Sequence, residues 1–285
     1  MGFTDLLNGV FGTLVYTLAG IALIVIGKLA YQVFNPGVNV KDELVEKDNL
    51  AFAVAHMGYF VGLLISIGSV LTGPSDGLLI DIINIGIYGL LSILLLNLAI
   101  IINDKLILRK FDIKKEIITD RNVGSGAAEA GAAIATGLVI CGSLYGEGTI
   151  WTALVFWVVG QAVLIATSFL YNAMLPYDIH DHIEKDNVAV GVGFAGALIA
   201  LGNLIRNGLV SDFTDWSESA IYLGFDVVVG LLMLPIARWG TDKILLPGRR
   251  LTDEIVNQDK PNVGAAILEA FSYIGGSVLI CWALA

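Results

Sequence analysis

The chain has 285 residues, of which 56% are hydrophobic and 15% are charged, and its formal net charge is −10. Soluble domains average about 45–50% apolar and about 25% charged residues, so this composition argues against a soluble globular protein. The acidic balance also argues against a nucleic-acid partner, because nucleic-acid-binding surfaces are basic. The sequence shows no HExxH, GxSxG or P-loop motif, and we therefore expect neither an enzyme nor a bound metal or cofactor.

Eight apolar blocks are each long enough to cross the roughly 30 Å hydrocarbon core of a lipid bilayer as a helix. They cover residues 10–33, 51–71, 82–102, 124–143, 150–171, 188–210, 218–237 and 263–282. The first block lacks the basic region and the cleavage site of a removable signal peptide, so we interpret it as a true span. The sequence thus predicts an all-α membrane protein with eight transmembrane helices.

Lysine and arginine concentrate in the connections after spans 1, 3, 5 and 7. These connections (34–50, 103–123, 172–187 and 238–262) hold 14 of the 16 basic residues, and Lys28 lies near the same side. Arg206 is the basic residue on the other side. Short loops rich in lysine and arginine stay in the cytoplasm. We therefore predict that the longer charged loops are cytoplasmic and that both termini face outward.

A short repeat underlies the span pattern. Glu-Lys-Asp-Asn occurs at 46–49 and again at 184–187, each time before a span rich in glycine and alanine. Two further spans begin after Asn122 and Asn262. An acid precedes the first three of these asparagines by six residues (Glu43, Glu116 and Asp181), whereas the fourth unit has two extra residues. The pattern predicts four copies of a two-helix unit.

A longer period overlies the short one. Residues 103–107 match residues 241–245 at a spacing of 138, and Cys141 matches Cys281 at a spacing of 140. The chain therefore divides into two four-helix halves, 1–143 and 144–285, each made of two units. Because every unit has an even number of spans, all copies point the same way across the membrane.

The combination of a charged connection, Glu-Lys-Asp-Asn and a glycine-spaced span resembles the YjfL-like family of bacterial inner-membrane proteins, a domain of unknown function (number 350). The chain resembles two tandem copies of that domain, which cover almost its whole length. This resemblance implies a location in the bacterial inner membrane, and it implies no activity.

The even-numbered spans are rich in small residues at intervals that let helix backbones approach closely. Gly58 and Gly62 lie in span 2, Gly126 in span 4 and Gly193 in span 6. We therefore expect the four even spans to form an inner bundle, with the odd spans outside facing lipid. The alternative is that these residues only pack each hairpin together.

Ionisable side chains inside a membrane indicate function, because a charge there costs at least ~2.5–3.5 kcal/mol. Glu129 and Glu269 stand seven residues after Asn122 and Asn262, and His56 stands seven after Asn49. If the even spans form an inner bundle, the two carboxylates could face each other across its axis, with His56 beside them. They could then serve as a relay for protons or cations, or could simply hydrogen-bond to a neighbouring helix.

Three other features allow more than one interpretation. Asp226 in span 7 is a further candidate for an ion pathway, unless a partner such as Asn84 or Asn97 makes it structural. His180 and His182 have metal-ligand spacing, but no third ligand is close in the sequence, which argues against a metal site. Cys141 and Cys281 fall on one side of the membrane and could be two buried apolar residues or a disulfide.

The favoured hypothesis is a channel or transporter for protons or small cations that uses Glu129, Glu269 and His56. The alternative is a membrane scaffold whose basic loops, above all 104–121, recruit a cytoplasmic protein or anionic lipid. Both hypotheses are compatible with a homo-oligomer.

Overall fold

The computed structural model describes residues 3–72, 75–145, 149–210, 215–246 and 248–284, with residues 3–8 described by their backbone alone. Eight of the described helices are long and apolar enough to cross a membrane, which confirms the eight predicted spans. They are α1 (Phe3–Phe34), α2 (Leu50–Leu71), α3 (Leu78–Leu106), α5 (Val123–Ser143), α6 (Ile150–Met174), α8 (Val188–Leu209), α9 (Trp216–Gly240) and α11 (Val263–Leu284). Shorter helices occupy the long connections: η1 (Asp42–Glu46), α4 (Ile113–Ile118), α7 (Ile179–Ile183), η2 (Thr241–Leu245) and α10 (Leu251–Val256).

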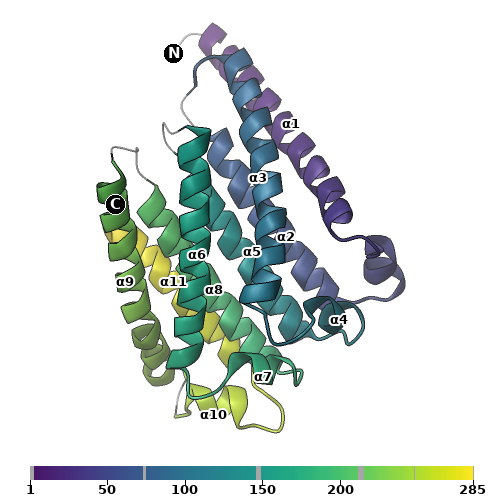
Figure 1. Ribbon diagram of the computed structural model, residues 1–285, viewed down its shortest axis with the longest axis vertical. Coiled ribbons are helices and arrows are strands. Elements are labelled where there is room, and N and C mark those ends of the chain that lie inside the picture. Colours follow the sequence, from purple (N-terminus) through teal and green to yellow (C-terminus); the bar gives the residue numbers. More distant parts are fainter. Residues whose placement is uncertain (1–2, 73–74, 146–148, 211–214, 247, 285) are drawn as a thin grey trace.

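The long helices form two layers. In the first layer α2, α5, α8 and α11 stand in a row, each packed against the next. In the second layer α3 contacts α2 and α5, α6 contacts α5 and α8, and α9 contacts α8 and α11. Figure 1 shows α3, α6 and α9 crossing in front of the row, with the short helices α4, α7 and α10 at one end of the molecule. The start of α1 and the end of α11 lie toward the opposite end.

The row differs from the inner bundle around a central axis that the sequence suggested. The central helices α5 and α8 are the most buried of the eight, as expected for the even-numbered spans. However, α2 and α11 stand at the two ends of the row, and α11 is largely exposed. A bundle around an axis would need α2 and α11 to meet. Instead α2 packs on α5, α5 on α8 and α8 on α11, and the row stays open.

Small residues set the close spacing within the row. Gly58 of α2 faces Ala130 of α5, and a Cβ atom at Gly58 would overlap the Ala130 backbone. The same contact recurs along the row as Gly131 with Ala195 and as Gly196 with Ala270. Gly62 and Gly126 lie at further backbone contacts between α2 and α5, against Ala133 and Ala51. Close approach of this kind is a main source of helix association in lipid.

At the two ends of the row, a large side chain replaces one member of the recurring glycine–alanine contact. Counted from the asparagine before each helix, Met57 of α2 takes the place that alanine has in α5, α8 and α11. Phe271 of α11 takes the place that glycine has in α2, α5 and α8. Both end residues are exposed, 50% for Met57 and 64% for Phe271. The close contact therefore cannot continue beyond either end.

Each helix of the row begins at one of the four repeated asparagines. The side-chain oxygens of Asn49, Asn122, Asn187 and Asn262 accept hydrogen bonds from the backbone N–H groups of Phe52, Ser125, Val190 and Ala265 at 3.0–3.2 Å. Asparagine is among the best residues for this position, because its oxygen satisfies an N–H group that the helix leaves unpaired. The repeated asparagine is thus an N-cap in every unit.

The same asparagine side chains connect successive units. The Asn49 Nδ2 group donates to the carbonyl oxygen of Ile117 in α4 at 2.9 Å. In the same way Asn122 donates to Ile183 in α7 at 2.6 Å and Asn187 donates to Ile255 in α10 at 2.9 Å. Three of the four also donate to the acid that precedes them, as in the pairs Asn49 with Glu43, Asn122 with Glu116 and Asn262 with Glu254. One side chain therefore starts a helix and links its unit to the next.

Backbone geometry explains why the fourth unit departs from the pattern. The residues immediately before the first three caps, Asp48, Arg121 and Asp186, adopt left-handed backbone angles with φ of 48°, 56° and 60°. The residue before Asn262 is Pro261. The proline ring fixes φ near −65° and forbids this turn. The fourth connection instead uses two extra residues, and Asn262 still reaches Glu254 at 2.9 Å.

We predict that Gly126→Leu separates α2 from α5, because a side chain there would overlap the backbone carbonyl group of Ala51. Overpacking of this kind typically costs ~1–3 kcal/mol of unfolding free energy. Thermal unfolding in detergent measures the loss. Gly224→Leu in α9 is the matched control, since nothing lies within 4 Å of a Cβ atom at that position. Equal loss in the two variants would contradict the packing of α2 on α5.

A second prediction compares two of the caps. Asn122→Ala removes a cap, worth about 1 kcal/mol. It also removes the two buried hydrogen bonds that the Asn122 side chain donates, to the Ile183 carbonyl group and to the Glu116 carboxylate, which adds about 1–3 kcal/mol. Asn262→Ala removes a cap at the exposed end of the row and should cost about 1 kcal/mol. Unfolding in detergent should therefore rank Asn122→Ala as the more destabilising change. The reverse ranking would show that the bond between units contributes little.

Candidate functional site

The first half contains a small polar cavity between α1, α2, α3, α4 and α5. Its volume is 40 Å³, and its lining includes Tyr31, Asn35, Phe52, Asp104, Lys114 and Glu129. Asp104 lies near the end of α3, and Glu129 lies about two turns inside α5. A cavity of this size holds one to about three water molecules or one small ion. Because Lys114 is an exposed residue of α4, the cavity lies at the end of the molecule that carries the long loops.

Among the described residues, the two carboxylates of the cavity have no cationic partner. Asp104 and Glu129 are close enough for their charges to interact, and no described lysine, arginine or histidine pairs with either. The Asp104 Oδ1 atom is buried and has no hydrogen-bond partner among the described residues. Two ionised carboxylates in a buried site repel each other, so the arrangement favours uptake of a proton or a cation.

His56 belongs to an aromatic cluster beside this cavity. Its ring lies 4.6 Å from the ring centre of Tyr31, 5.1 Å from Phe52 and 4.9 Å from Phe60. The His56 Nδ1 atom is buried and has no hydrogen-bond partner among the described residues. His56 therefore approaches the Asp104–Glu129 cavity through Tyr31 and Phe52, which also line that cavity.

Glu269 occupies a different environment in the second half. Its carboxylate is buried, accepts a hydrogen bond from the Tyr273 hydroxyl group at 2.9 Å and forms an ion pair with Arg238 of α9. Arg238 also donates to the Thr252 hydroxyl group at 3.0 Å. Gly193 of α8 makes room for this carboxylate, because a Cβ atom at Gly193 would lie 2.5 Å from Glu269 Oε2. Glu269 is thus neutralised within the protein.

The structure does not bring Glu129 and Glu269 together. Glu129 lies on α5 and Glu269 on α11, and α8 stands between these helices in the row. The expectation that the two carboxylates face each other across an axis required a closed bundle, and the open row removes it. Each glutamate instead has a charged residue of its own unit as its neighbour. Glu129 lies beside Asp104 of α3, and Glu269 pairs with Arg238 of α9.

Asp226 lies near the middle of α9, in the second half of the chain, whereas the cavity lies in the first half. Its carboxylate accepts a hydrogen bond from Asn207 at 2.9 Å, close to the C-terminal end of α8. The partners that the sequence suggested were Asn84 and Asn97, but Asn97 bonds to Tyr59 at 3.1 Å. This contact places Asp226 in the packing of α8 against α9.

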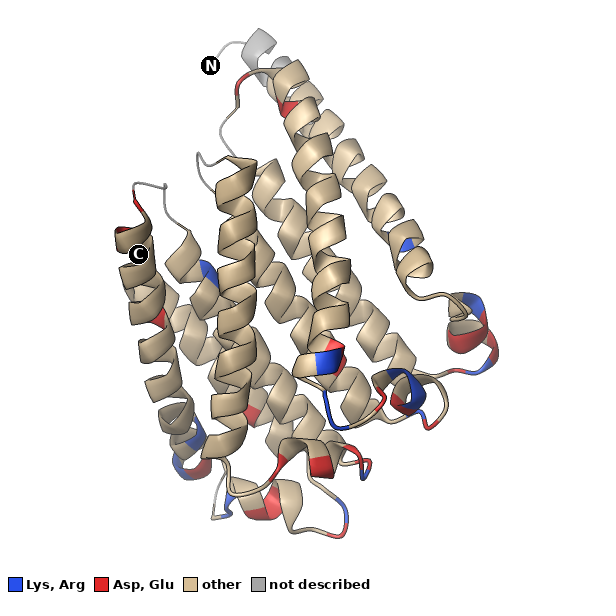
Figure 2. Cartoon of the chain, in the orientation of Figure 1, with Lys and Arg blue, Asp and Glu red and all other residues tan. Residues whose placement is uncertain are grey.

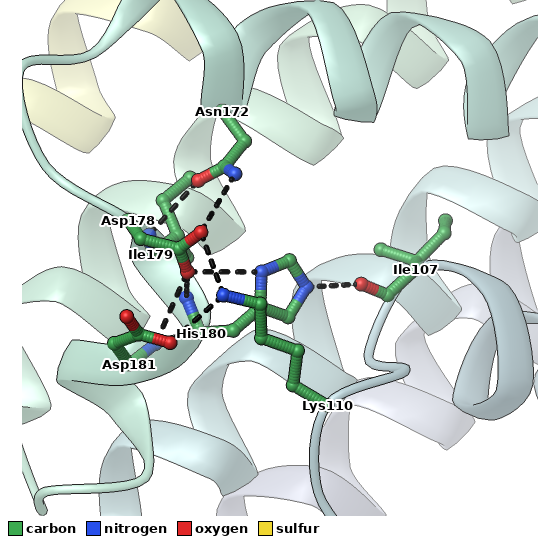
Figure 3. Close-up of polar contacts among 7 residues, drawn as sticks. All are labelled: Ile107, Lys110, Asn172, Asp178, Ile179, His180 and Asp181. Carbon is green, nitrogen blue, oxygen red and sulfur yellow. Dashed lines mark hydrogen bonds and ion pairs between the residues drawn. The ribbon is translucent and has the colours of Figure 1, made fainter.

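His180 takes part in a joint between the two halves (Figure 3). Its Nε2 atom donates to the Ile107 carbonyl group beyond α3 at 2.6 Å. Lys110 of the first half forms ion pairs with Asp178 and Asp181 of the second half, both at 2.8 Å. Burial alone would raise the pKa of Asp178, but hydrogen bonds from Lys110 and the Asp181 backbone outweigh it and hold the pKa at about 2. The His-Asp-His segment therefore connects helices.

The two cysteines are free thiols in the structure. Cys141 lies on α5 and Cys281 on α11, again on either side of α8. Cys281 instead accepts a hydrogen bond from Asn203 of α8 at 3.4 Å. Of the two interpretations that the sequence allowed, the structure therefore shows separate thiols.

Sequence reasoning missed Asp104 and Arg238, the residues that give the two glutamates their different surroundings. Asp104 lies at the loop end of α3 and Arg238 at the loop end of α9, where charged residues normally face water. The signal that could have found Asp104 was the match of residues 103–107 to residues 241–245, because it places Asp104 and Asp242 at equivalent positions.

The fold and the cavity define a multi-pass α-helical membrane protein with a half-buried pair of carboxylates near its loop end. A family model described as a domain of unknown function (DUF350) matches residues 5–144 and again residues 146–284. The chain therefore belongs to this family and carries two tandem copies of its domain, which confirms the resemblance seen in the sequence.

A curated relative supports the membrane assignment. A UPF0719 transmembrane protein of Aquifex aeolicus (strain VF5) is 22% identical over 178 residues. The match covers 61% of this chain and 64% of the relative, so this chain spans less than two thirds of the relative's length. No solved structure matches the chain.

Proposed function

We propose that the protein is a channel or transporter for protons or small cations and that Asp104 and Glu129 lie on its path. The observation that carries the proposal is that two carboxylates from separate helices line one cavity, where no described lysine, arginine or histidine pairs with either. An uncompensated charge in a membrane costs at least ~2.5–3.5 kcal/mol. A site that keeps such a charge gains stability whenever a proton or a cation enters.

Polar side chains continue along α5 beyond Glu129. Thr136 and Ser143 follow at intervals of seven residues, which places all three on one side of the helix. Thr136 accepts a hydrogen bond from Asn103 at 2.9 Å, and Asn103 accepts one from Gln161 at 2.5 Å. Buried hydroxyl and amide groups of this kind can relay protons or coordinate ions, so the stripe supports a path that leads away from the cavity.

The rival function is a scaffold whose basic loops recruit anionic lipid or a cytoplasmic protein. Figure 2 shows that most lysine and arginine residues gather at the end with the short helices, interspersed with acids. Several of these cations are already paired there: Lys47 with Asp42 and Glu43, Lys110 with Asp178 and Asp181, Lys115 with Asp120, and Arg249 with Glu254. Such pairing weakens the attraction of this surface for anionic lipid, and we favour the pathway.

The proposal includes the location and orientation of the chain. We place it in a bacterial inner membrane as four parallel two-helix units, with the long loops in the cytoplasm and both termini outside. The distribution of basic residues and the four recurring asparagine caps support this arrangement. The cavity then opens toward the cytoplasm. The proposal assigns no enzymatic reaction to the chain.

We predict that Glu129→Gln and Asp104→Asn each reduce proton or cation flux in liposomes. Each variant removes one carboxylate charge and should lose at least about 1.4 kcal/mol of ion stabilisation, hence about tenfold in rate. The control is Asp226→Asn, which keeps a side chain that can bond to Asn207 and lies away from the cavity. Wild-type flux no greater than that of empty liposomes, over a range of pH and cations, would reject the pathway.

The orientation has its own test. In a chain whose two cysteines are replaced by serine, we introduce a cysteine at Asp76 or at Lys115, in loops at opposite ends of the helices. An impermeant thiol reagent added outside should label the residue at position 76 and leave the residue at position 115 unlabelled. The opposite labelling pattern would reverse the proposed topology.

A further inference from the structure

The two halves of the chain contain the same pair of acids. Asp104 and Glu129 of the first half correspond to Asp242 and Glu269 of the second, at spacings of 138 and 140 residues. Each aspartate lies at the loop end of an odd-numbered span, and each glutamate lies seven residues after a capping asparagine. In the second half the Asp242 carboxylate accepts a hydrogen bond from the Leu251 backbone at 2.5 Å, and Glu269 pairs with Arg238, one helical turn before Asp242. The tandem copies thus repeat one polar site.

The second copy contains its own cation. The guanidinium group of Arg238, one helical turn before Asp242, pairs with Glu269 and donates to Thr252 at 3.0 Å. The same group lies 5.8 Å from the ring centre of Tyr177, within the range of a cation–π contact. A planar cation is therefore held there by a carboxylate, a hydroxyl group and an aromatic ring.

The first copy has the acids but lacks this cation. The residue equivalent to Arg238 is Ile100, and the residue equivalent to Thr252 is Lys114. The Lys114 ammonium group bonds to the Pro36 carbonyl group at 3.1 Å. The acids are left with a 40 Å³ cavity, the unpartnered Asp104 Oδ1 atom and an aromatic wall that includes Tyr31.

We propose that the cavity of the first half binds a small monovalent cation of the guanidinium type, in the place that the Arg238 side chain takes in the second half. The inference rests on the proposed function and names the class of ion that its site accepts. Divalent metal ions such as Ca²⁺ and Mg²⁺ need six or more oxygen ligands. Two carboxylates beside aromatic rings suit a planar cation, which forms paired hydrogen bonds and stacks on ring faces.

Equilibrium dialysis of the detergent-solubilised full chain with radiolabelled guanidinium at millimolar concentration tests the proposal. We expect one site per wild-type chain. Glu129→Gln and Asp104→Asn should weaken binding by about 30-fold or more, the loss expected when one partner of a buried charge pair is removed. Arg249→Ala, which removes an exposed arginine outside both sites, should still bind one guanidinium ion.

The second half supplies a gain-of-site test. Arg238→Ala vacates the second copy, so this variant should bind two guanidinium ions, and guanidinium should raise its lowered melting temperature toward the wild-type value. Wild-type binding that Glu129→Gln and Asp104→Asn leave unchanged would overturn the proposal, as would a folded Arg238→Ala variant that binds only one ion. If Arg238→Ala does not fold, the first-half variants decide the question.

The flux measurements separate this inference from the proposed function. Proton flux that depends on Glu129, in a protein that binds no guanidinium, would overturn the inference and leave the pathway standing. Guanidinium binding that depends on Glu129, in a protein without flux of any ion, would support the binding site and reject transport.

Discussion

The arrangement of the helices depends on one side-chain amide that is used four times. Each repeated asparagine caps a helix of the row through its oxygen, and in three units its nitrogen reaches the carbonyl group of the following short helix. In a membrane, where little hydrophobic force acts between helices, such specific bonds fix which helix lies beside which. The glycine and alanine contacts deeper in the bilayer set the close spacing between these neighbouring helices.

The different surroundings of Glu129 and Glu269 follow from small differences between copies of this unit. Glu129 and Glu269 lie at equal distances along the chain from their caps, so the fold delivers both to the same depth. A difference at a single position, Ile100 in the first half and Arg238 in the second, decides whether an arginine of the chain neutralises the acid pair. The duplicated domain thus keeps one copy closed by its own arginine and leaves the other copy with a cavity.

Much of this architecture could be predicted from the sequence, because local patterns determine it. The eight spans follow from hydrophobic length, and the asparagine motif identified the start of each row helix together with the family. Partner choice across the bilayer could not be predicted. Small residues at Gly58 or Gly126 signal a close contact without saying whether the helices close into a bundle or stay in a row. For the same reason the pairing of Glu129 with Glu269 was wrong, and Asp104 was overlooked as a loop residue.

The open row has a consequence for the history of such proteins. In a closed ring of helices, the angle between neighbouring helices fixes how many helices the ring contains. Adding or losing a helix would therefore open the ring. A row imposes no such condition, and a unit can be gained or lost at an end if the new terminal helix presents large apolar side chains to lipid, as Met57 and Phe271 do. An added unit would need a small residue where Met57 or Phe271 now stands. It would leave the contacts within the existing row unchanged, and the extra copy would be free to change its chemistry.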